Sequence, residues 1–227
     1  MSDGRSGNKK EIALEDRAFE GERLYSPSAG RNKDVVRDVL VAHLPGKGRV
    51  LEIGAGTGEH AITFAAALPE VTWLPGDPDE MSRASIAAWT AHEGAKNIAQ
   101  PHAIDVTAPD WQVAPASLSG IVSLNMIHIA PFAAARGLFA GAGRYLQGGG
   151  VLFLYGPFSR DGVHTAPSNA EFDASLKARD PSWGVRDLDR DLAPLARDAG
   201  LSLIACIEMP KNNLSIVFKR YGQERVA

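Results

Sequence analysis

Short apolar runs alternate along this chain with longer segments in which apolar residues recur at helical spacing. Runs of this length predict strands, and the spaced segments predict helices. Strands are predicted over residues 50–53, 71–74, 98–104, 120–125, 151–155, 201–208 and 214–219, and helices over 59–68, 81–92, 132–146 and 188–199, the last closed by Gly200. This alternation predicts an α/β fold with a mostly parallel sheet and helices on both faces. In such sheets, ligands bind at the carboxyl ends of the strands.

Two segments lie outside this alternation. Residues 25–32 are predicted as a loop that leads into a helix, and residues 157–187 form a long connection after the fifth strand. Connections of this length are usually functional lids or disordered. We therefore divide the chain into a disordered tail over residues 1–12, an N-terminal lid or helical extension over 13–48, and a main domain over 49–227. The main domain carries the long connection as a substrate-side insertion.

The composition excludes several functions. With 227 residues, 44% of them hydrophobic, the chain is long enough for one large domain. Its net charge of −3 is spread without a basic patch, so nucleic acid is not an expected partner. No apolar run reaches the length of a membrane span, and the N-terminus lacks a signal-peptide core. We therefore expect a cytoplasmic protein, either a monomer or a homodimer, that contacts neither membrane nor nucleic acid.

Metal and disulfide chemistry are not expected either. Cys206 is the only cysteine, and it lies in an apolar strand-like run, which favours a buried and inert thiol. The six histidines show no ligand-like spacing. The sequence therefore predicts neither a disulfide nor a metal site.

A glycine-rich turn follows the first predicted strand, in the run Glu52-Ile53-Gly54-Ala55-Gly56-Thr57-Gly58-Glu59-His60. Alternate glycines let the backbone turn sharply and approach a ligand closely, and the helix N-terminus beyond offers unpaired N–H groups. Glu52, an acid in an apolar strand, needs a polar partner. An adenosine-type cofactor is predicted here, and a glycine-rich turn without a ligand is the alternative. The expected cofactor-binding residues are Glu52, Gly54, Gly56, Thr57, Gly58 and His60.

The spacing of the glycines distinguishes between cofactors. A dinucleotide fingerprint needs Gly or Ala at the sixth position from Gly54, where this chain has Glu59. A Walker A loop is excluded as well, because no Gly-Lys-Ser or Gly-Lys-Thr follows. The pattern Glu-x-Gly-x-Gly-x-Gly instead resembles the first motif of the S-adenosylmethionine-dependent methyltransferases.

Acidic residues follow the next two predicted strands. Asp77 can accept both ribose hydroxyls of the cofactor; its alternative is a turn before Pro78, and Asp79 is a nearby competitor. Asp105 and the backbone N–H of Val106 can bind the edge of the adenine ring, and the alternative for Asp105 is a helix or turn cap.

Asn125 and His128 follow the fourth predicted strand, where chemistry is expected in such a sheet. Asn125 is predicted to contact the amino-acid end of the cofactor. His128 is either a general base, because its usual pKa lies near neutral pH, or a histidine that hydrogen-bonds the backbone and shapes the loop. Tyr155 and Phe158 close the fifth strand as pocket walls. Tyr155 is also a catalytic candidate, because aromatic faces attract a sulfonium cation.

The remaining candidates lie in the N-terminal loop, the long connection and the last turn. Tyr25 offers another aromatic face, and Arg31 and Asn32 are predicted to bind the cofactor, Arg31 through the cofactor carboxylate. Ser168 fits a capping box at a helix start. Further substrate contacts are expected from His164, Asn169, Asn212 and Asn213. The last two residues equally suit a hairpin turn.

Longer blocks of the chain resemble an uncharacterised methyltransferase-like family, a domain of unknown function, over about residues 20–220. The blocks are Ser26-Pro27, Arg31-Asn32, Glu52 to His60, Asn125 to Ile129, Leu138 to Ala142, Leu154 to Phe158, Asp180 to Gly184 and Met209 to Leu214. The resemblance implies the Rossmann-like class I methyltransferase fold, a seven-stranded sheet whose last strand is antiparallel, with S-adenosylmethionine as cofactor. It implies no substrate, and it assigns no catalytic role within residues 23–32 or 157–187.

The function predicted from these observations is methyl transfer from S-adenosylmethionine to an O, N or S atom of a small molecule. The methyl donor is already activated, so the protein would act mainly by alignment and exclusion of water. The alternatives are a non-catalytic S-adenosylmethionine-binding or scaffold protein, a protein or RNA methyltransferase with an open charged groove, and a nicotinamide-dependent oxidoreductase, which Glu59 disfavours.

Overall fold

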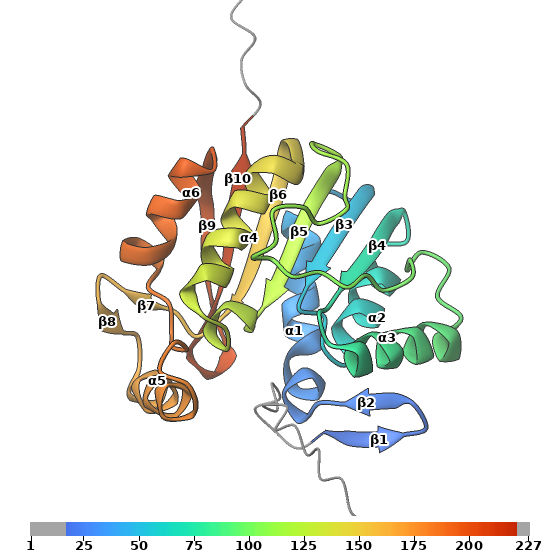
Figure 1. Ribbon diagram of the computed structural model, residues 1–227, viewed down its shortest axis with the longest axis horizontal. Coiled ribbons are helices and arrows are strands. Elements are labelled where there is room, and N and C mark those ends of the chain that lie inside the picture. Colours follow the sequence, from blue (N-terminus) through green and yellow to red (C-terminus); the bar gives the residue numbers. More distant parts are fainter. Residues whose placement is uncertain (1–16, 222–227) are drawn as a thin grey trace, which may run out of the picture.

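A six-stranded sheet lies at the centre of the computed structural model, which describes residues 17–221 (Figure 1). The strands lie in the order β4-β3-β5-β6-β10-β9. β10 runs antiparallel to both of its neighbours, and the β3–β4, β3–β5 and β5–β6 pairs are parallel. Their bounds are β3 Gly48–Ile53, β4 Val71–Gly76, β5 Leu118–Leu124, β6 Leu146–Gly156, β9 Leu201–Met209 and β10 Asn213–Arg220.

Helices cover both faces of this sheet, as the alternating pattern predicted (Figure 1). The α-helices are α1 Pro27–His43, α2 Glu59–Ala67, α3 Glu80–Glu93, α4 Phe132–Tyr145, α5 Pro167–Arg179 and α6 Ala193–Asp198. Successive residues of a strand point to opposite faces of the sheet, so the sheet has a hydrophobic core on each face. Val50 packs with residues of α1 and α2, whereas Leu51 packs with residues of α4 and α6. Within residues 17–221, every helix is too short or too polar to cross a membrane.

One of the seven predicted strands, over residues 98–104, does not form. Residues 98–104 run beside β4, but only two isolated bridges join them, Trp73 with Ile98 and Gly76 with His102. Pro75 in β4 and Pro101 in this segment have no N–H group, so each removes a ladder bond. The hydrogen bonds that remain come from the N–H groups on either side of these prolines. The sheet therefore has six strands, and this edge is irregular.

The predicted loop over residues 25–32 is also wrong. A hairpin of β1 (Ala18–Glu20) and β2 (Arg23–Tyr25) leads directly into α1. Ser26 caps that helix, because its Oγ accepts the Ala29 N–H at 3.2 Å, and Pro27 occupies the first helical position. Serine followed by proline is typical of a helix start. The tail predicted over residues 1–12 lies outside the described residues.

The long connection is folded throughout. It contains the two-stranded hairpin of β7 (Ser159–Arg160) and β8 (Val163–His164), followed by α5. Ser168 does not cap α5: the helix begins at Pro167, two residues earlier than the capping box requires, and Ala166 stands at the cap. The Ser168 Oγ instead accepts a hydrogen bond from Asn212 Nδ2 at 3.0 Å.

The helix predicted over residues 188–199 is divided in two. A π-helix (η2, Leu188–Leu192) precedes α6, and the Asp187 side chain caps it by accepting the N–H groups of Asp189 and Arg190. Two further short turns are 3₁₀ helices: η1 (Met126–His128) lies between β5 and α4, and η3 (Pro210–Asn212) joins β9 to β10.

Candidate functional site

The glycine turn lies between the ends of β3 and β4. The N–H groups of Gly54 and Ala55 both donate to the Gly76 carbonyl, at 2.9 and 3.1 Å, and fix the turn to β4. A Cβ on Gly54 would come within 2.9 Å of Met126, and one on Gly58 within 3.0 Å of Ile86. A Cβ on Gly56 would meet nothing closer than 3.9 Å. Gly54 and Gly58 therefore permit close packing, and Gly56 is the open part of the turn.

Asp77 lies against this open part. Its side chain is buried, with 7% of the residue exposed, and its Oδ2 accepts the Gly56 N–H at 2.9 Å. Its Oδ1 accepts the Asp79 N–H, also at 2.9 Å. Asp79, the competing candidate, caps α3 by accepting the Ser82 N–H. Each carboxylate oxygen of Asp77 keeps a second lone pair, so the ribose role of Asp77 stays a prediction that this geometry accommodates.

Glu52 has the polar partner that its burial requires. It is 1% exposed, and its Oε2 accepts the Trp73 Nε1–H at 2.7 Å. Burial raises the pKa of Glu52 to about 8, and the Asp77 carboxylate adds to this rise. At neutral pH, Glu52 is therefore mainly a neutral acid beneath the turn.

Two side chains that the sequence analysis gave no role attach the N-terminal segment to this turn. The Glu59 Oε2 accepts the Ser26 N–H at 2.6 Å and the Thr57 Oγ1–H at 3.0 Å. The Ser85 Oγ accepts the Leu24 N–H at 2.8 Å and donates to the Thr57 carbonyl at 2.7 Å. Apart from the bond between Glu59 and Thr57, these contacts join residues 28 to 61 positions apart along the chain. Local sequence patterns carry no signal for them.

Four predicted residues from separate elements meet in one network. His60 Nε2 lies 2.8 Å from the Asn32 Oδ1, and burial lowers the pKa of His60 to about 4. The Tyr155 hydroxyl accepts from Asn213 Nδ2 at 3.0 Å and is hydrogen-bonded to the Asn32 side chain. Burial raises the pKa of Tyr155, which stays a neutral phenol at neutral pH. Asn32 thereby connects α1 to both α2 and β6.

His128 follows Asn125, whose left-handed backbone (φ 60°) ends β5. His128 is completely buried, and its Nδ1 accepts the Arg186 N–H at 3.2 Å. An Nδ1 that accepts leaves the ring proton on Nε2. Burial lowers the pKa of His128 to about 3, and the Arg186 charge contributes to this. The geometry is that of a histidine that hydrogen-bonds the backbone, the second of the two predicted roles, and its catalytic role stays a prediction.

Arg186 is a buried residue that the sequence analysis did not single out. Its Nε donates to the Ile127 carbonyl at 2.9 Å, and its Nη2 donates to the Ala130 carbonyl at 2.6 Å. Its side chain therefore fixes the turn that holds His128. An arginine inside a segment with no recognisable motif gives no signal for this role.

The predicted substrate contacts in the long connection bind other parts of the protein. Phe158 is completely buried with its ring edge-on to His128, 4.8 Å between centroids, so it packs beneath the site. His164 Nε2 lies 3.4 Å from Asp173 Oδ2. Asn169 is buried and donates to the Asn212 carbonyl at 2.9 Å, which brings two predicted residues together and joins α5 to η3.

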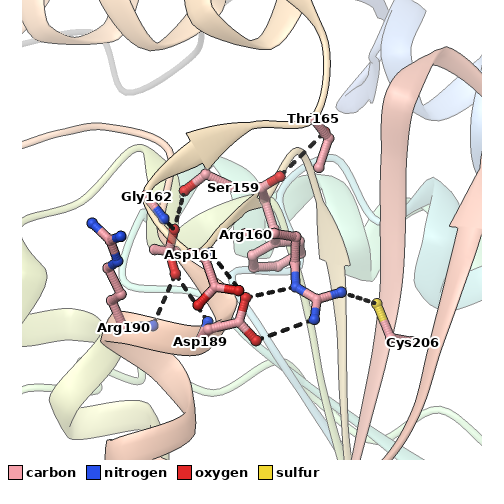
Figure 2. Close-up of polar contacts among 10 residues, drawn as sticks. Ser159, Arg160, Asp161, Gly162, Thr165, Asp189, Arg190 and Cys206 are labelled. Carbon is pink, nitrogen blue, oxygen red and sulfur yellow. Dashed lines mark hydrogen bonds and ion pairs between the residues drawn. The ribbon is translucent and has the colours of Figure 1, made fainter.

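Arg160 attaches the β7–β8 hairpin to the rest of the domain (Figure 2). Its guanidinium makes two hydrogen bonds to the Asp189 carboxylate, at 2.7 and 3.1 Å, and its Nη1 lies 4.0 Å from the Cys206 sulfur. The Asp161 N–H donates to Asp189 as well (Figure 2). Cys206 is exposed, so the expectation of a buried thiol is wrong, because β9 is an edge strand.

The other predicted residues are Asp105, Val106, Tyr25 and Arg31. The Asp105 Oδ1 accepts the N–H and Oγ1–H of Thr107, which is the turn-cap alternative for this residue, and Val106 is buried. The Tyr25 hydroxyl donates to Glu20, and its ring lies edge-on to Trp89. Arg31 is exposed on the first turns of α1. Residues 17–221 contain no group of three His, Cys, Asp or Glu side chains placed to hold a metal ion.

Comparison with solved structures identifies proteins with a similar fold. An O-methyltransferase family protein from Burkholderia thailandensis matches with a TM-score of 0.71 and 17% identity, over 87% of this chain and 57% of that one. A putative methyltransferase from Bacillus halodurans C-125 matches with a TM-score of 0.65 and 15% identity, over 83% and 99%. These likenesses show the Rossmann-like class I methyltransferase fold, as predicted.

A third structure, geranyl diphosphate C-methyltransferase from Streptomyces coelicolor A3(2), contains Mg²⁺, geranyl diphosphate and S-adenosyl-L-homocysteine. It matches with a TM-score of 0.67 and 9% identity, over 84% of this chain and 80% of that one. The model of a family described as "Protein of unknown function (DUF938)" matches residues 23–220. That range is close to the one over which the motifs resemble a methyltransferase-like family.

Proposed function

This chain belongs to the DUF938 family, and we propose that it is an S-adenosylmethionine-dependent methyltransferase that acts on an O, N or S atom of a small molecule. The observation that carries the proposal is the pairing of Asp77 with Gly56 at the carboxyl ends of β3 and β4. A buried acceptor lies there beside backbone where a Cβ would meet nothing closer than 3.9 Å. Methyltransferase structures with the same fold support the proposal.

The residues present fit an adenosyl cofactor. Asp77 can accept two ribose hydroxyls with its remaining lone pairs, and the open face of Gly56 lets the ligand approach the backbone. Asn125, at the end of β5, would contact the amino-acid part. When bound, S-adenosylmethionine supplies a methyl group that is already activated as a sulfonium. The protein itself would orient the acceptor and exclude water, which lowers the barrier substantially.

The proposed acceptor side contains neutral polar groups. Tyr155 stays protonated, because burial raises the pKa of its hydroxyl. His128 stays neutral, because burial lowers its pKa to about 3. We propose that both side chains hold the acceptor by hydrogen bonds. Where the acceptor carries a proton, His128 can take it only after the ring proton of His128 has moved from Nε2 to Nδ1. In the proposal, the described part of the N-terminal extension (residues 17–48) and the insertion over residues 157–187 flank this side.

Equilibrium binding of S-adenosylhomocysteine tests the cofactor site. The wild type should bind S-adenosylhomocysteine. Asp77→Ala should weaken the binding free energy by roughly 1–3 kcal/mol, because the buried ribose loses its hydrogen-bond partner. Asp79→Ala is the matched control: it removes the cap of α3 and lowers stability without touching the proposed ribose contact. Unchanged affinity in Asp77→Ala would overturn the proposed site.

Methyl transfer to a panel of small O, N and S nucleophiles tests the activity. Labelled methyl groups in a small-molecule product support the proposal. Tight binding of S-adenosylmethionine without turnover on any of them would instead indicate a non-catalytic binding protein. Transfer to protein or RNA alone would replace the proposed substrate class.

A further inference from the structure

Arg17 lies over the part of the glycine turn that is otherwise open. It precedes β1, and its Nη1 donates to the Ser82 Oγ at 3.4 Å, near the start of α3. Its Nη2 lies 3.9 Å from the position that a Cβ on Gly56 would take. Among the described residues other than the chain neighbours Ala55 and Thr57, this guanidinium is the side chain nearest to that position.

The guanidinium also lies within electrostatic range of Asp77. Burial raises the pKa of the Asp77 carboxyl, and Arg17 is one of the groups that oppose this rise. Arg17 thus lies close to Gly56 and within electrostatic range of Asp77, the two features that carry the proposed cofactor site. A ligand that lies over Gly56 with its ribose on Asp77 must contact Arg17 or displace it.

The strand that follows Arg17 is free to adjust to such a ligand. All three residues of β1 are exposed, and among the described strands β1 pairs only with β2. β2, in contrast, is attached to α3, because Trp89 Nε1 donates to the Leu24 carbonyl and Ser85 accepts the Leu24 N–H. The outer strand can therefore shift while the inner strand stays in place.

We infer that Arg17 binds the carboxylate of the cofactor's methionine part. This inference rests on the proposed function. The carboxylate is the only anionic group of S-adenosylmethionine, and a guanidinium matches it with two parallel hydrogen bonds. The ribose hydroxyls offer Arg17 no charge, and the sulfonium and the ammonium group repel it. Arg17, rather than Arg31, is thus the residue that selects an adenosyl ligand with a free carboxylate.

Two ligands that differ in one group test this inference. S-adenosylhomocysteine and its decarboxylated counterpart share the adenosine, the thioether and the amine, and only the first carries the carboxylate. Calorimetry should show a loss of about 10- to 100-fold in the affinity of Arg17→Gln for S-adenosylhomocysteine. The affinity for the decarboxylated ligand should change less than about twofold, and Arg17→Lys should recover part of the loss.

Arg23→Gln on the inner strand of the same hairpin is the control. Arg23 stacks on Trp89 at 4.9 Å and pairs with Glu20, so its loss perturbs the hairpin and leaves the carboxylate preference unchanged. An equal loss for both ligands in Arg17→Gln, or no loss for either, would overturn the inference. So would a carboxylate-specific loss in Arg31→Gln with Arg17→Gln unaffected. If the wild type binds neither ligand, the proposed function fails and the role of Arg17 fails with it.

Discussion

Replacing Glu52 by glutamine should change how the stability of this protein depends on pH. Glu52 is buried beneath the glycine turn, and burial raises its pKa from 4.5 to about 8. Between these two values the folded protein holds a proton that the unfolded chain has lost. The free energy of unfolding therefore falls as pH rises through this window, and the loss is complete above pH 8. Glutamine has no such proton, and its Oε1 can still accept the Trp73 Nε1–H.

The size of the effect follows from the two pKa values. They differ by about 3.5 pKa units, and each unit corresponds to about 1.4 kcal/mol, so the full effect is about 5 kcal/mol above pH 8. At pH 7 only about 2.5 units of the window have been crossed, which corresponds to about 3 kcal/mol. Glu52→Gln should therefore gain stability relative to the wild type as pH rises, by several kcal/mol between pH 5 and pH 9.

Urea denaturation at five or six pH values measures this difference directly. Glu70→Gln is the control, because Glu70 is exposed in the connection before β4 and its replacement should give a nearly flat difference. If the difference in unfolding free energy between Glu52→Gln and the wild type does not change from pH 5 to pH 9, the assigned proton on Glu52 is wrong. The assay is done without any S-adenosyl ligand, so that ligand binding does not add to the free energy of unfolding.

Two further substitutions test the turn around His128. Burial lowers the pKa of His128 to about 3, so between its usual pKa and that value only the unfolded chain binds a proton, and wild-type stability falls as pH falls. His128→Asn should reduce this acid loss by about 3 kcal/mol between pH 7 and pH 4 in urea denaturation. In a methyl-transfer assay of the same variant, turnover slowed by a factor of about 10²–10⁴ with unchanged cofactor affinity would indicate that His128 is a base. A fall in both stability and cofactor affinity would indicate that His128 has a positioning role. Gly156→Ala should lower the free energy of unfolding by about 1–3 kcal/mol in thermal denaturation, because its Cβ would lie 2.5 Å from His128 Nε2. Gly46→Ala is the control, because a Cβ there would meet open space and should not lower stability. Equal Tm values for the two variants would contradict this packing around His128.

Local periodicity was sufficient to predict most of the sheet. The runs that became β3 and β5 were predicted within two residues at each end, and that of β6 was predicted except for its first five residues and its last, because buried parallel strands are apolar throughout. The same rule failed for residues 98–104, where Pro101 and Pro75 on the neighbouring strand remove bonds that a strand needs. The capping of α1 by Ser26 was readable in principle, since the serine and the proline are adjacent in sequence.

The candidate site was predicted where its residues follow strands. Asp77 and the glycine turn are neighbours in space because parallel strands end at one edge of the sheet. Asn32, His60 and Tyr155 were each singled out, but nothing in the sequence indicated that they touch one another. Arg17 was missed because its contacts are with residues 39 to 65 positions away. Such pairs depend on tertiary packing, which local patterns do not encode.

The Ser85 hydroxyl makes two distant segments into one cooperative unit. It accepts from Leu24 in the hairpin and donates to Thr57 in the turn. If the hairpin separates from α3, the hydroxyl loses one partner and the Thr57 carbonyl is held less firmly. The free energies of opening the N-terminal hairpin and of loosening the glycine turn are therefore coupled through this hydroxyl. Order at the edge of the molecule is in this way thermodynamically linked to the backbone geometry at its centre.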